Sequence, residues 1–325
     1  MTLPSNSPSK QVLQSASLSA ITRRRIAHLI RKTDLLPTRM TLPAGTEIHY
    51  KTENFQFTGS FKLRGASAKL SGLPIDRPVI TASSGNHGIA CSLAAQRTGH
   101  NLTVVLPENV IAQKREKIES FGTRVIIAGA DSSLAEVHAR SLAQAEGHTY
   151  VSPYNDADVI AGQGTIGLEL LEQMPQIDNI LISMGGGGLI SGIGSVMKSM
   201  SPVTKIIGVS ATNTAALAAS IKAGQIVETE HFDTLADGVA GGVDANSLTL
   251  PLATEVIDEI IHIDEQAIAE ALKIMAWTEN MIVEGAAAMA LAPLLASPER
   301  YAGKTNVVLL CGANYDKPSI AKLLV

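Results

Sequence analysis

The chain has 325 residues, enough for two lobes or for one large α/β domain with a deep pocket. Hydrophobic residues make up 45% of it and charged residues 17%, which is a globular composition, and no apolar run approaches the length of a membrane span. The net charge of −4 and the aromatic content of 3% argue against a nucleic-acid partner. Residues 1–19 lack the apolar segment of a secretory signal, so we expect a polar arm and a cytoplasmic location. Two cysteines cannot form a disulfide framework.

Strand and helix patterns alternate along most of the chain. Strands are predicted near residues 46–56, 79–84, 101–107, 124–129, 179–184, 205–211 and 304–312, and helices near residues 21–33, 86–99, 109–122, 132–147, 161–174, 185–200, 265–280, 284–296 and 317–325. Glycines 99, 122 and 147 are expected to end three of these helices. Residues 225–250 show no sustained period and are expected to form loops and short helices. Repeated βα units predict an α/β fold with two open, mostly parallel twisted sheets and covering helices.

Lys62 is a candidate nucleophile. It lies between Gly59 and Gly65, after Ser60 and Phe61, where a helix is expected to begin. Desolvation in a cleft would lower its pKa and make the amine reactive toward a carbonyl group. The alternative is a solvated lysine at the start of a helix, since most lysine side chains are exposed.

The segment 83–88, Ser-Ser-Gly-Asn-His-Gly, joins a predicted strand to a predicted helix. Free N–H groups at a helix N-terminus, together with the hydroxyls of Ser83 and Ser84 and the amide of Asn86, can bind a carboxylate or a phosphate. An ordinary helix cap is the alternative, because Ser and Asn are preferred caps. His87, with no second ligand-type residue beside it, is by itself a weak indication of a site.

A run of four glycines, Gly185, Gly186, Gly187 and Gly188, followed by Leu189, comes directly after an apolar strand and before a helix. Such a loop lets several backbone N–H groups surround an anion, so it predicts a phosphate site. The GxGxxG dinucleotide pattern fails because Ile190 or Ser191 stands where its third glycine is required, and no Gly-Lys-Ser/Thr follows for a Walker loop. A nicotinamide-dinucleotide or mononucleotide fold is therefore disfavoured.

Cys311 follows the strand predicted at 304–312, where strand ends face the ligand crevice of an open sheet. A buried, inert cysteine is the alternative. Taken together, a nucleophilic lysine, a glycine phosphate loop, a carboxylate-binding turn and a neutral donor indicate pyridoxal 5'-phosphate, an aldehyde that carries a phosphate and a ring nitrogen.

These motifs resemble those of one enzyme family. TGSFKLRGA, SSGNHG, DVIAGQGTIGLEL, GGGGL and CGAN occur in the order and approximate spacing found in serine/threonine dehydratases and serine racemase, pyridoxal-phosphate enzymes of the tryptophan-synthase β fold. The likeness covers about residues 20–325. We expect residues 1–52 and 150–325 to form a large cofactor-binding domain and residues 53–149 a small domain.

The resemblance implies a role for each matching residue. Lys62 would bond covalently to the cofactor aldehyde and later remove the Cα proton of the substrate, and Ser84 would be a second catalytic group. The substrate carboxylate would contact Ser83, Ser84, Asn86 and His87. The cofactor would contact Phe61, Lys62, Asn86, Gly185, Gly186, Gly187, Gly188, Leu189, Gly238, Glu284 and Cys311, with Asn86 on the ring hydroxyl, Cys311 at the ring nitrogen and Glu284 near the ring edge.

The predicted activity is that of an ammonia-lyase (dehydratase), which converts a small β-hydroxy amino acid such as L-threonine or L-serine to a 2-oxo acid and ammonia. A neutral thiol at the ring nitrogen makes the ring a weaker electron sink, which favours rapid loss of the β-hydroxyl. Serine or amino-acid racemisation is an alternative, because Ser84 could reprotonate the face opposite Lys62. Specialised dehydratases of the threo-3-hydroxyaspartate, phenylserine or hydroxyectoine-utilisation type are further alternatives.

Other expectations concern ligands and partners. Racemase-type relatives bind a divalent cation through acidic residues after the strand at 205–211, and Ser210 and Ala216 stand here without a carboxylate, so no metal is predicted. A homodimer is expected from the resemblance. Tyr154 and residues 35–41 could line the substrate pocket or simply pack. A nicotinamide oxidoreductase and a non-catalytic binding protein are rival classes, which the failed dinucleotide pattern and the presence of Lys62 disfavour.

Overall fold

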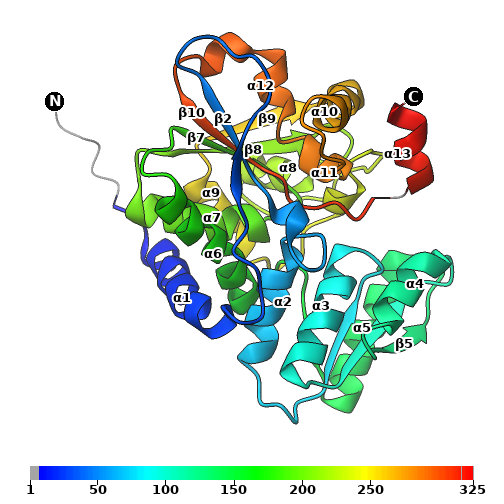
Figure 1. The fold of residues 1–325 in the computed structure, drawn as a ribbon. Helices are drawn as coiled ribbons and strands as arrows, with labels where there is room; N and C mark the ends of the chain where they lie inside the picture. Colours follow the sequence, from blue (N-terminus) through cyan, green and yellow to red (C-terminus); the bar gives the residue numbers. More distant parts are fainter. Residues whose placement is uncertain (1–6, 316, 325) are drawn as a thin grey trace.

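The computed structural model describes residues 7–315 and 317–324, which form two open sheets with covering helices (Figure 1). The larger sheet has six strands in the order β1-β2-β10-β7-β8-β9, and the smaller has four in the order β5-β4-β3-β6. Of the strand pairs in the described residues, only β1 with β2 is antiparallel. The predicted fold class, two open and mostly parallel sheets, is confirmed.

The strands match the apolar runs of the sequence. Those of the larger sheet are β1 (Leu35–Pro37), β2 (Glu47–Lys51), β7 (Asn179–Ser183), β8 (Lys205–Ala211), β9 (Glu259–Ile263) and β10 (Thr305–Leu309), and those of the smaller are β3 (Val79–Ala82), β4 (Leu102–Leu106), β5 (Arg124–Ile127) and β6 (Thr149–Tyr150). Every residue of β4 and β7 is buried, as expected for parallel strands covered on both faces. The edge strand β1 was not predicted, because three residues ending in proline show no period.

The helices occupy the segments between the strands. They are α1 (Lys10–Ile26), α2 (Lys62–Ser71), α3 (Asn86–Thr98), α4 (Ala112–Glu119), α5 (Ser132–Glu146), α6 (Ala157–Gln173), α7 (Gly188–Met200), α8 (Ala216–Ala223), α9 (Thr249–Val256), α10 (Glu265–Trp277), α11 (Gly285–Ala288), α12 (Ala292–Ala296) and α13 (Lys317–Leu324), with short 3₁₀ turns η1 (Glu53–Phe55), η2 (Asp237–Val239) and η3 (Pro298–Tyr301). Gly99 and Gly147 end α3 and α5 with φ of 78° and 69°, as predicted. The helix predicted at 284–296 is divided into α11 and α12, and Pro293 begins the second.

The N-terminal region differs from the prediction. The helix expected at 21–33 is correct only for residues 21–26, because α1 begins at Lys10 and ends at Ile26, and the expected polar arm is wrong from Lys10 onward. Residues 1–6 of that arm lie outside the described residues. The side chain of Ser9 caps this helix by accepting from the N–H of Val12 at 3.3 Å. The buried positions include alanine, serine and threonine, which hid the helical period. These small residues allow close packing on α6 and α7, where a Cβ at Gly164 would lie 2.1 Å from the Ser19 hydroxyl.

Helix α2 connects the two sheets. It packs on α3 beside the smaller sheet and on α6 beside the larger (Figure 1). The segment before it pairs with the segment after β10: the N–H of Phe61 donates to Cys311 O at 3.0 Å, and the N–H of Ala313 donates to Gly59 O at 2.8 Å. These bonds hold Lys62, the first residue of α2, at the carboxyl end of β10. The predicted division into domains 1–52 with 150–325 and 53–149 stays a prediction.

A buried ion cluster fixes the start of α2. The guanidinium of Arg64, fully buried, donates to both oxygens of Glu53 at 2.7 and 2.9 Å and to both oxygens of Glu169 at 2.7 and 2.9 Å. The amine of Lys51 donates to Glu169 at 2.6 Å and to the carbonyl of Thr33 at 2.8 Å. Two cations and two carboxylates balance within the cluster, so each buried charge has a partner. The cluster joins β2, η1, α2 and α6 two residues from Lys62.

We predict that Arg64→Leu lowers the free energy of unfolding by about 3–5 kcal/mol, because it leaves buried carboxylates without their main partner. Urea denaturation followed by circular dichroism measures the change. The control is Arg23→Leu, which removes a pair with Glu172 whose side chains are 33% and 45% exposed and should cost under about 1 kcal/mol. Equal losses in the two variants would contradict the role of the buried cluster.

Candidate active site

The loops at the carboxyl ends of β3, β7 and β10 and the start of α2 enclose one pocket between the sheets. Its walls come from Phe61, Lys62, Asn86, Pro153, Tyr154, Ser183, Gly185–Ile190, Gly238, Val239, Glu284 and Cys311. Segments more than two hundred residues apart in the sequence therefore meet here. The position agrees with the rule that ligands bind at the carboxyl ends of strands in open sheets.

Lys62 is half-buried in this pocket, and its Nζ donates to the carbonyl oxygen of Pro153 at 2.8 Å. Within the described ranges no carboxylate lies within ion-pair distance of the amine. Burial lowers the pKa of Lys62 to about 8, although Cys311, Cys91 and Glu284 act in the opposite direction. Roughly a tenth of the amine is therefore unprotonated and nucleophilic at pH 7, far more than at its ordinary pKa of 10.5.

Asn86, Glu284 and Asn314 form a polar cluster beside Lys62. The Asn86 Nδ2 donates to the two oxygens of Glu284 at 2.8 and 3.1 Å, and the Asn314 backbone N–H donates to Glu284 Oε2 at 3.1 Å. Burial raises the pKa of Glu284 to about 7, against the lowering effect of the Asn86 hydrogen bond. This carboxyl group can therefore exchange a proton near neutral pH. A Cβ at Gly312 would lie 2.5 Å from Glu284 Oε1, so only glycine leaves room for it.

Cys311 lies on the same side of the pocket and is 3% exposed. Its Sγ donates to Glu284 Oε1 at 3.8 Å. Burial raises the pKa of the Cys311 thiol well above its ordinary value, and the nearby Glu284 raises it further. The thiol is therefore neutral at physiological pH, and it is a weak donor rather than a charged group.

The four glycines form a tight loop at the N-terminus of α7. A Cβ at Gly186 would lie 2.5 Å from the ring of Tyr154, and one at Gly188 would lie 3.0 Å from the Tyr154 backbone. Gly187 adopts a φ of 87°, which favours glycine. The oxygen of Gly186 accepts from the Thr249 hydroxyl at 2.6 Å, which fixes the loop from behind. The first N–H groups of α7 have no carbonyl partner in their own helix, so the loop can hold an anion.

The remaining residues of the segment 83–88 do not line the pocket. His87 is 3% exposed, and its Nε2 lies 2.9 Å from the Val151 carbonyl. Burial and the charge of Lys62 lower the pKa of His87 to about 3, so the ring is neutral. Ser83 accepts from the Gly85 N–H at 3.2 Å, and Ser84 is half-buried. The contacts predicted for these three residues with a substrate carboxylate stay predictions.

Sequence reasoning left out several residues of the pocket. Tyr154, considered only as a possible substrate contact, packs on the glycine loop and accepts from the Asp244 N–H at 2.8 Å. Pro153, Ser183 and Val239 also line the pocket without having been predicted. Of these, Ser183 could have been predicted to line the pocket, because it lies at the end of a predicted strand just before the glycine run.

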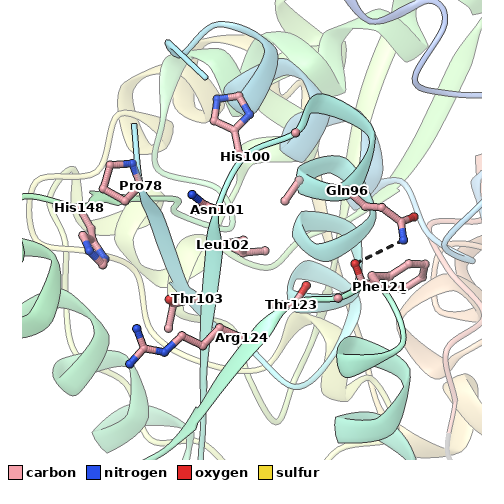
Figure 2. A pocket seen from close by; sticks show the side chains of 13 residues that line it. Pro78, Gln96, His100, Asn101, Leu102, Thr103, Phe121, Thr123, Arg124 and His148 are labelled. Atoms are coloured by element: carbon pink, nitrogen blue, oxygen red, sulfur yellow. Dashed lines mark hydrogen bonds between the residues drawn. The ribbon is translucent and has the colours of Figure 1, made fainter. Parts of the chain in front are cut away.

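A second hollow lies at the amino ends of β4 and β5, on the opposite edge of the smaller sheet (Figure 2). Thr103, Arg124 and His148 line one side of this hollow, and Gln96 and Phe121 line the other. None of the predicted site residues lies there.

The described residues contain neither a membrane-spanning helix nor a cluster of metal ligands. In residues 7–315 and 317–324, no helix combines the length and the hydrophobicity that a bilayer crossing requires. The same residues contain no group of three or more His, Cys, Asp or Glu side chains placed to hold a metal ion. The predicted absence of a metal stays a prediction.

Comparison with known proteins identifies the family. Residues 26–312 match the family model "Pyridoxal-phosphate dependent enzyme". The L-threonine ammonia-lyase of Thermotoga maritima is 36% identical over 306 residues, which cover 93% of this chain and 76% of that protein.

Solved structures with a similar fold include a threonine deaminase and a serine racemase. The processed form of threonine deaminase isoform 2 from Solanum lycopersicum has a TM-score of 0.90 at 31% identity, covering 99% of this chain and 94% of that one. Maize serine racemase has a TM-score of 0.85 at 29% identity, covering 94% and 95%. The chain belongs to the pyridoxal-phosphate dependent enzymes, in the group that contains threonine dehydratases and serine racemases.

Proposed function

We propose that this protein is a pyridoxal-phosphate dependent ammonia-lyase (dehydratase) that converts a small β-hydroxy amino acid, such as L-threonine or L-serine, to a 2-oxo acid and ammonia. The observation that carries the proposal is the half-buried Lys62 amine, whose pKa is about 8, in the same pocket as the glycine loop. The identity to L-threonine ammonia-lyases, 36% over most of the chain, supports the same reaction.

The pocket has the chemical groups that this cofactor needs. The unpaired N–H groups of the loop at Gly185–Leu189 suit its phosphate, and the Lys62 amine suits its aldehyde. We assign the Asn86 amide to the ring hydroxyl and the neutral thiol of Cys311 to the ring nitrogen. Phe61 and Gly238, which also line the pocket, would contact the ring.

Pyridoxal phosphate, when bound, supplies an aldehyde that condenses with amines and a ring that withdraws electrons from the α-carbon of the amino acid. Lys62 acts as the base that removes the Cα proton, since an amine with a pKa of about 8 holds and releases a proton near neutral pH. A neutral Cys311 beside the ring nitrogen would not keep that nitrogen protonated as a carboxylate would, so the ring would be a weaker electron sink, which favours elimination of the β-hydroxyl. Glu284, with a pKa of about 7, accepts hydrogen bonds from the Asn86 amide and the Cys311 thiol and can exchange a proton near neutral pH.

Substrate binding is assigned to the turn before α3. Ser83, Ser84 and the N-terminal N–H groups of that helix would bind the substrate carboxylate, with Asn86 next to them. His87 would support this turn as a neutral ring from behind. Ser84 is the candidate acid for the leaving hydroxyl.

Racemisation is the second candidate function. A hydroxyl at Ser84 could return a proton to the face opposite Lys62, and maize serine racemase covers nearly the whole chain at a TM-score of 0.85. We place it second because the sequence relatives at 33–37% identity bear threonine dehydratase and ammonia-lyase names. A homodimer and a cytoplasmic location stay predictions, the first of them open to light scattering on the purified protein.

The activity itself is tested on purified holoenzyme. We expect ammonia and a 2-oxo acid in equal amounts from one or more of L-serine, L-threonine, threo-3-hydroxyaspartate, phenylserine and hydroxyectoine-derived amino acids. Lys62→Ala should reduce this rate by at least about 10³-fold, because it removes both nucleophile and base. Chiral chromatography of the same L-serine reaction measures D-serine, and D-serine in excess of pyruvate would put racemisation first.

The pH dependence of the Lys62 amine follows from its lowered pKa. In cofactor-free protein, we expect competitive labelling with acetic anhydride to show half-maximal reactivity of Lys62 at about pH 8, with the protonated, unreactive form below it. The charge of Glu284 raises this pKa, so Glu284→Gln should move the midpoint lower. Mass spectrometry of the peptide gives the labelled fraction. A midpoint near the ordinary 10.5 would refute a desolvated amine.

Gly186→Ala tests the phosphate loop. The new Cβ would meet the Tyr154 ring, so the loop must shift, and we expect the dissociation constant of pyridoxal phosphate to rise about 10-fold or more. Absorbance titration of cofactor-free protein gives this constant. Gly242→Ala is the matched control, because a Cβ there meets no atom within 4 Å. If both variants bind the cofactor like wild type, the loop does not hold the phosphate.

A further inference from the structure

One hydrogen bond joins the helix α4 of the smaller sheet to the segment that follows β10 of the larger. Lys117 lies on the exposed face of α4, and its Nζ donates to Asn314 Oδ1 at 2.7 Å. Lys117 does not line the pocket, and its hydrogen-bond partner in the described residues is Asn314.

The side-chain amide of Asn314 has a fixed orientation. Its Nδ2 donates to Asn86 Oδ1 at 2.6 Å and to the Thr58 carbonyl at 2.8 Å, which uses both of its protons. Its Oδ1 is then left to accept from Lys117. The amide packs on Gly59, where a Cβ would lie 3.1 Å from Asn314 Oδ1.

Asn86 is oriented in turn. Because its Oδ1 accepts from Asn314, its Nδ2 must point the other way, and it donates to both oxygens of Glu284 at 2.8 and 3.1 Å. If the Asn314 amide turned over, two oxygens would face each other. Relieving that contact by turning Asn86 would place an amide oxygen against the Glu284 carboxylate and remove a donor from the pocket.

We propose that Lys117 is a positioning residue, which fixes the orientation of Asn314 and thereby keeps the Asn86 donor directed into the cofactor pocket. The inference rests on the proposed function, in which Asn86 contacts pyridoxal phosphate. It names a residue of α4 outside every motif that the family likeness rests on.

The test measures cofactor affinity. We expect Lys117→Met to raise the dissociation constant of pyridoxal phosphate about 5-fold, the size of one lost hydrogen bond, and Asn314→Ala to raise it at least as much. The double variant should equal Asn314→Ala, since the two act in series. Lys117→Arg keeps a donor and should recover most of the affinity. The KM for the amino acid, measured at saturating cofactor, should stay within about 2-fold of wild type in Lys117→Met, because the substrate carboxylate is assigned to Ser83, Ser84 and the N–H groups of α3.

Arg115→Met is the control, because it removes a cation of the same helix that pairs with Glu119. Unchanged cofactor affinity in Lys117→Met, or additive losses in the double variant, would overturn the proposal. A fall in affinity equal to that of Arg115→Met would overturn it too, since only net charge would then matter. Wild-type protein that fails to bind pyridoxal phosphate at all would instead refute the proposed function.

Discussion

The site depends on holding one amine in a buried place without a carboxylate partner. A carboxylate beside Lys62 would stabilise the ammonium form and keep the amine protonated, whereas the carbonyl of Pro153 accepts one hydrogen bond and adds no full charge. Desolvation therefore dominates, and the pKa falls to about 8. The backbone around it must be rigid for this balance to hold. The pairing of residues 59–61 with residues 311–313 and the Arg64 cluster supply that rigidity on two sides.

Burial also shifts the pKa of the acid in the pocket, Glu284, but it raises this pKa instead of lowering it. Glu284 is buried like Lys62, and burial raises its pKa to about 7 despite hydrogen bonds from Asn86, Asn314 and Cys311. The Cys311 thiol beside it stays neutral. The pocket therefore contains a base and an acid whose pKa values both lie near neutral, and the charge of Glu284 raises the pKa of Lys62. A change in charge at either one alters the proton affinity of the other.

Features of the fold and of the site could be predicted from the sequence where neighbouring residues in the chain carry the pattern. Buried parallel strands such as β7 are unbroken apolar runs, and glycines at 99 and 147 ended their helices, so the α/β class and most elements were predictable. The glycine loop and Lys62 were predictable because their neighbours in the chain carry the pattern. The first half of helix α1 was missed because the buried positions Ala16, Ser19 and Thr22 are small residues that give no apolar period. The Lys117–Asn314 contact was out of reach, since nothing near either residue indicates a partner 197 positions away.

The residues around the pocket differ in which sheet's elements carry them. Helix α2 packs on both α3 and α6, so Lys62 stands on the element shared by the two sheets. Asn86, by contrast, begins α3, while Glu284 and Asn314 belong to segments around the larger sheet. Asn86 meets Glu284 at 2.8 and 3.1 Å and Asn314 at 2.6 Å, and two exposed contacts, Lys117 with Asn314 and Arg140 with Asp244 at 3.4 Å, also join these segments. Lys62 therefore stands on the shared element, whereas the donor set around it is assembled from segments that belong to different sheets.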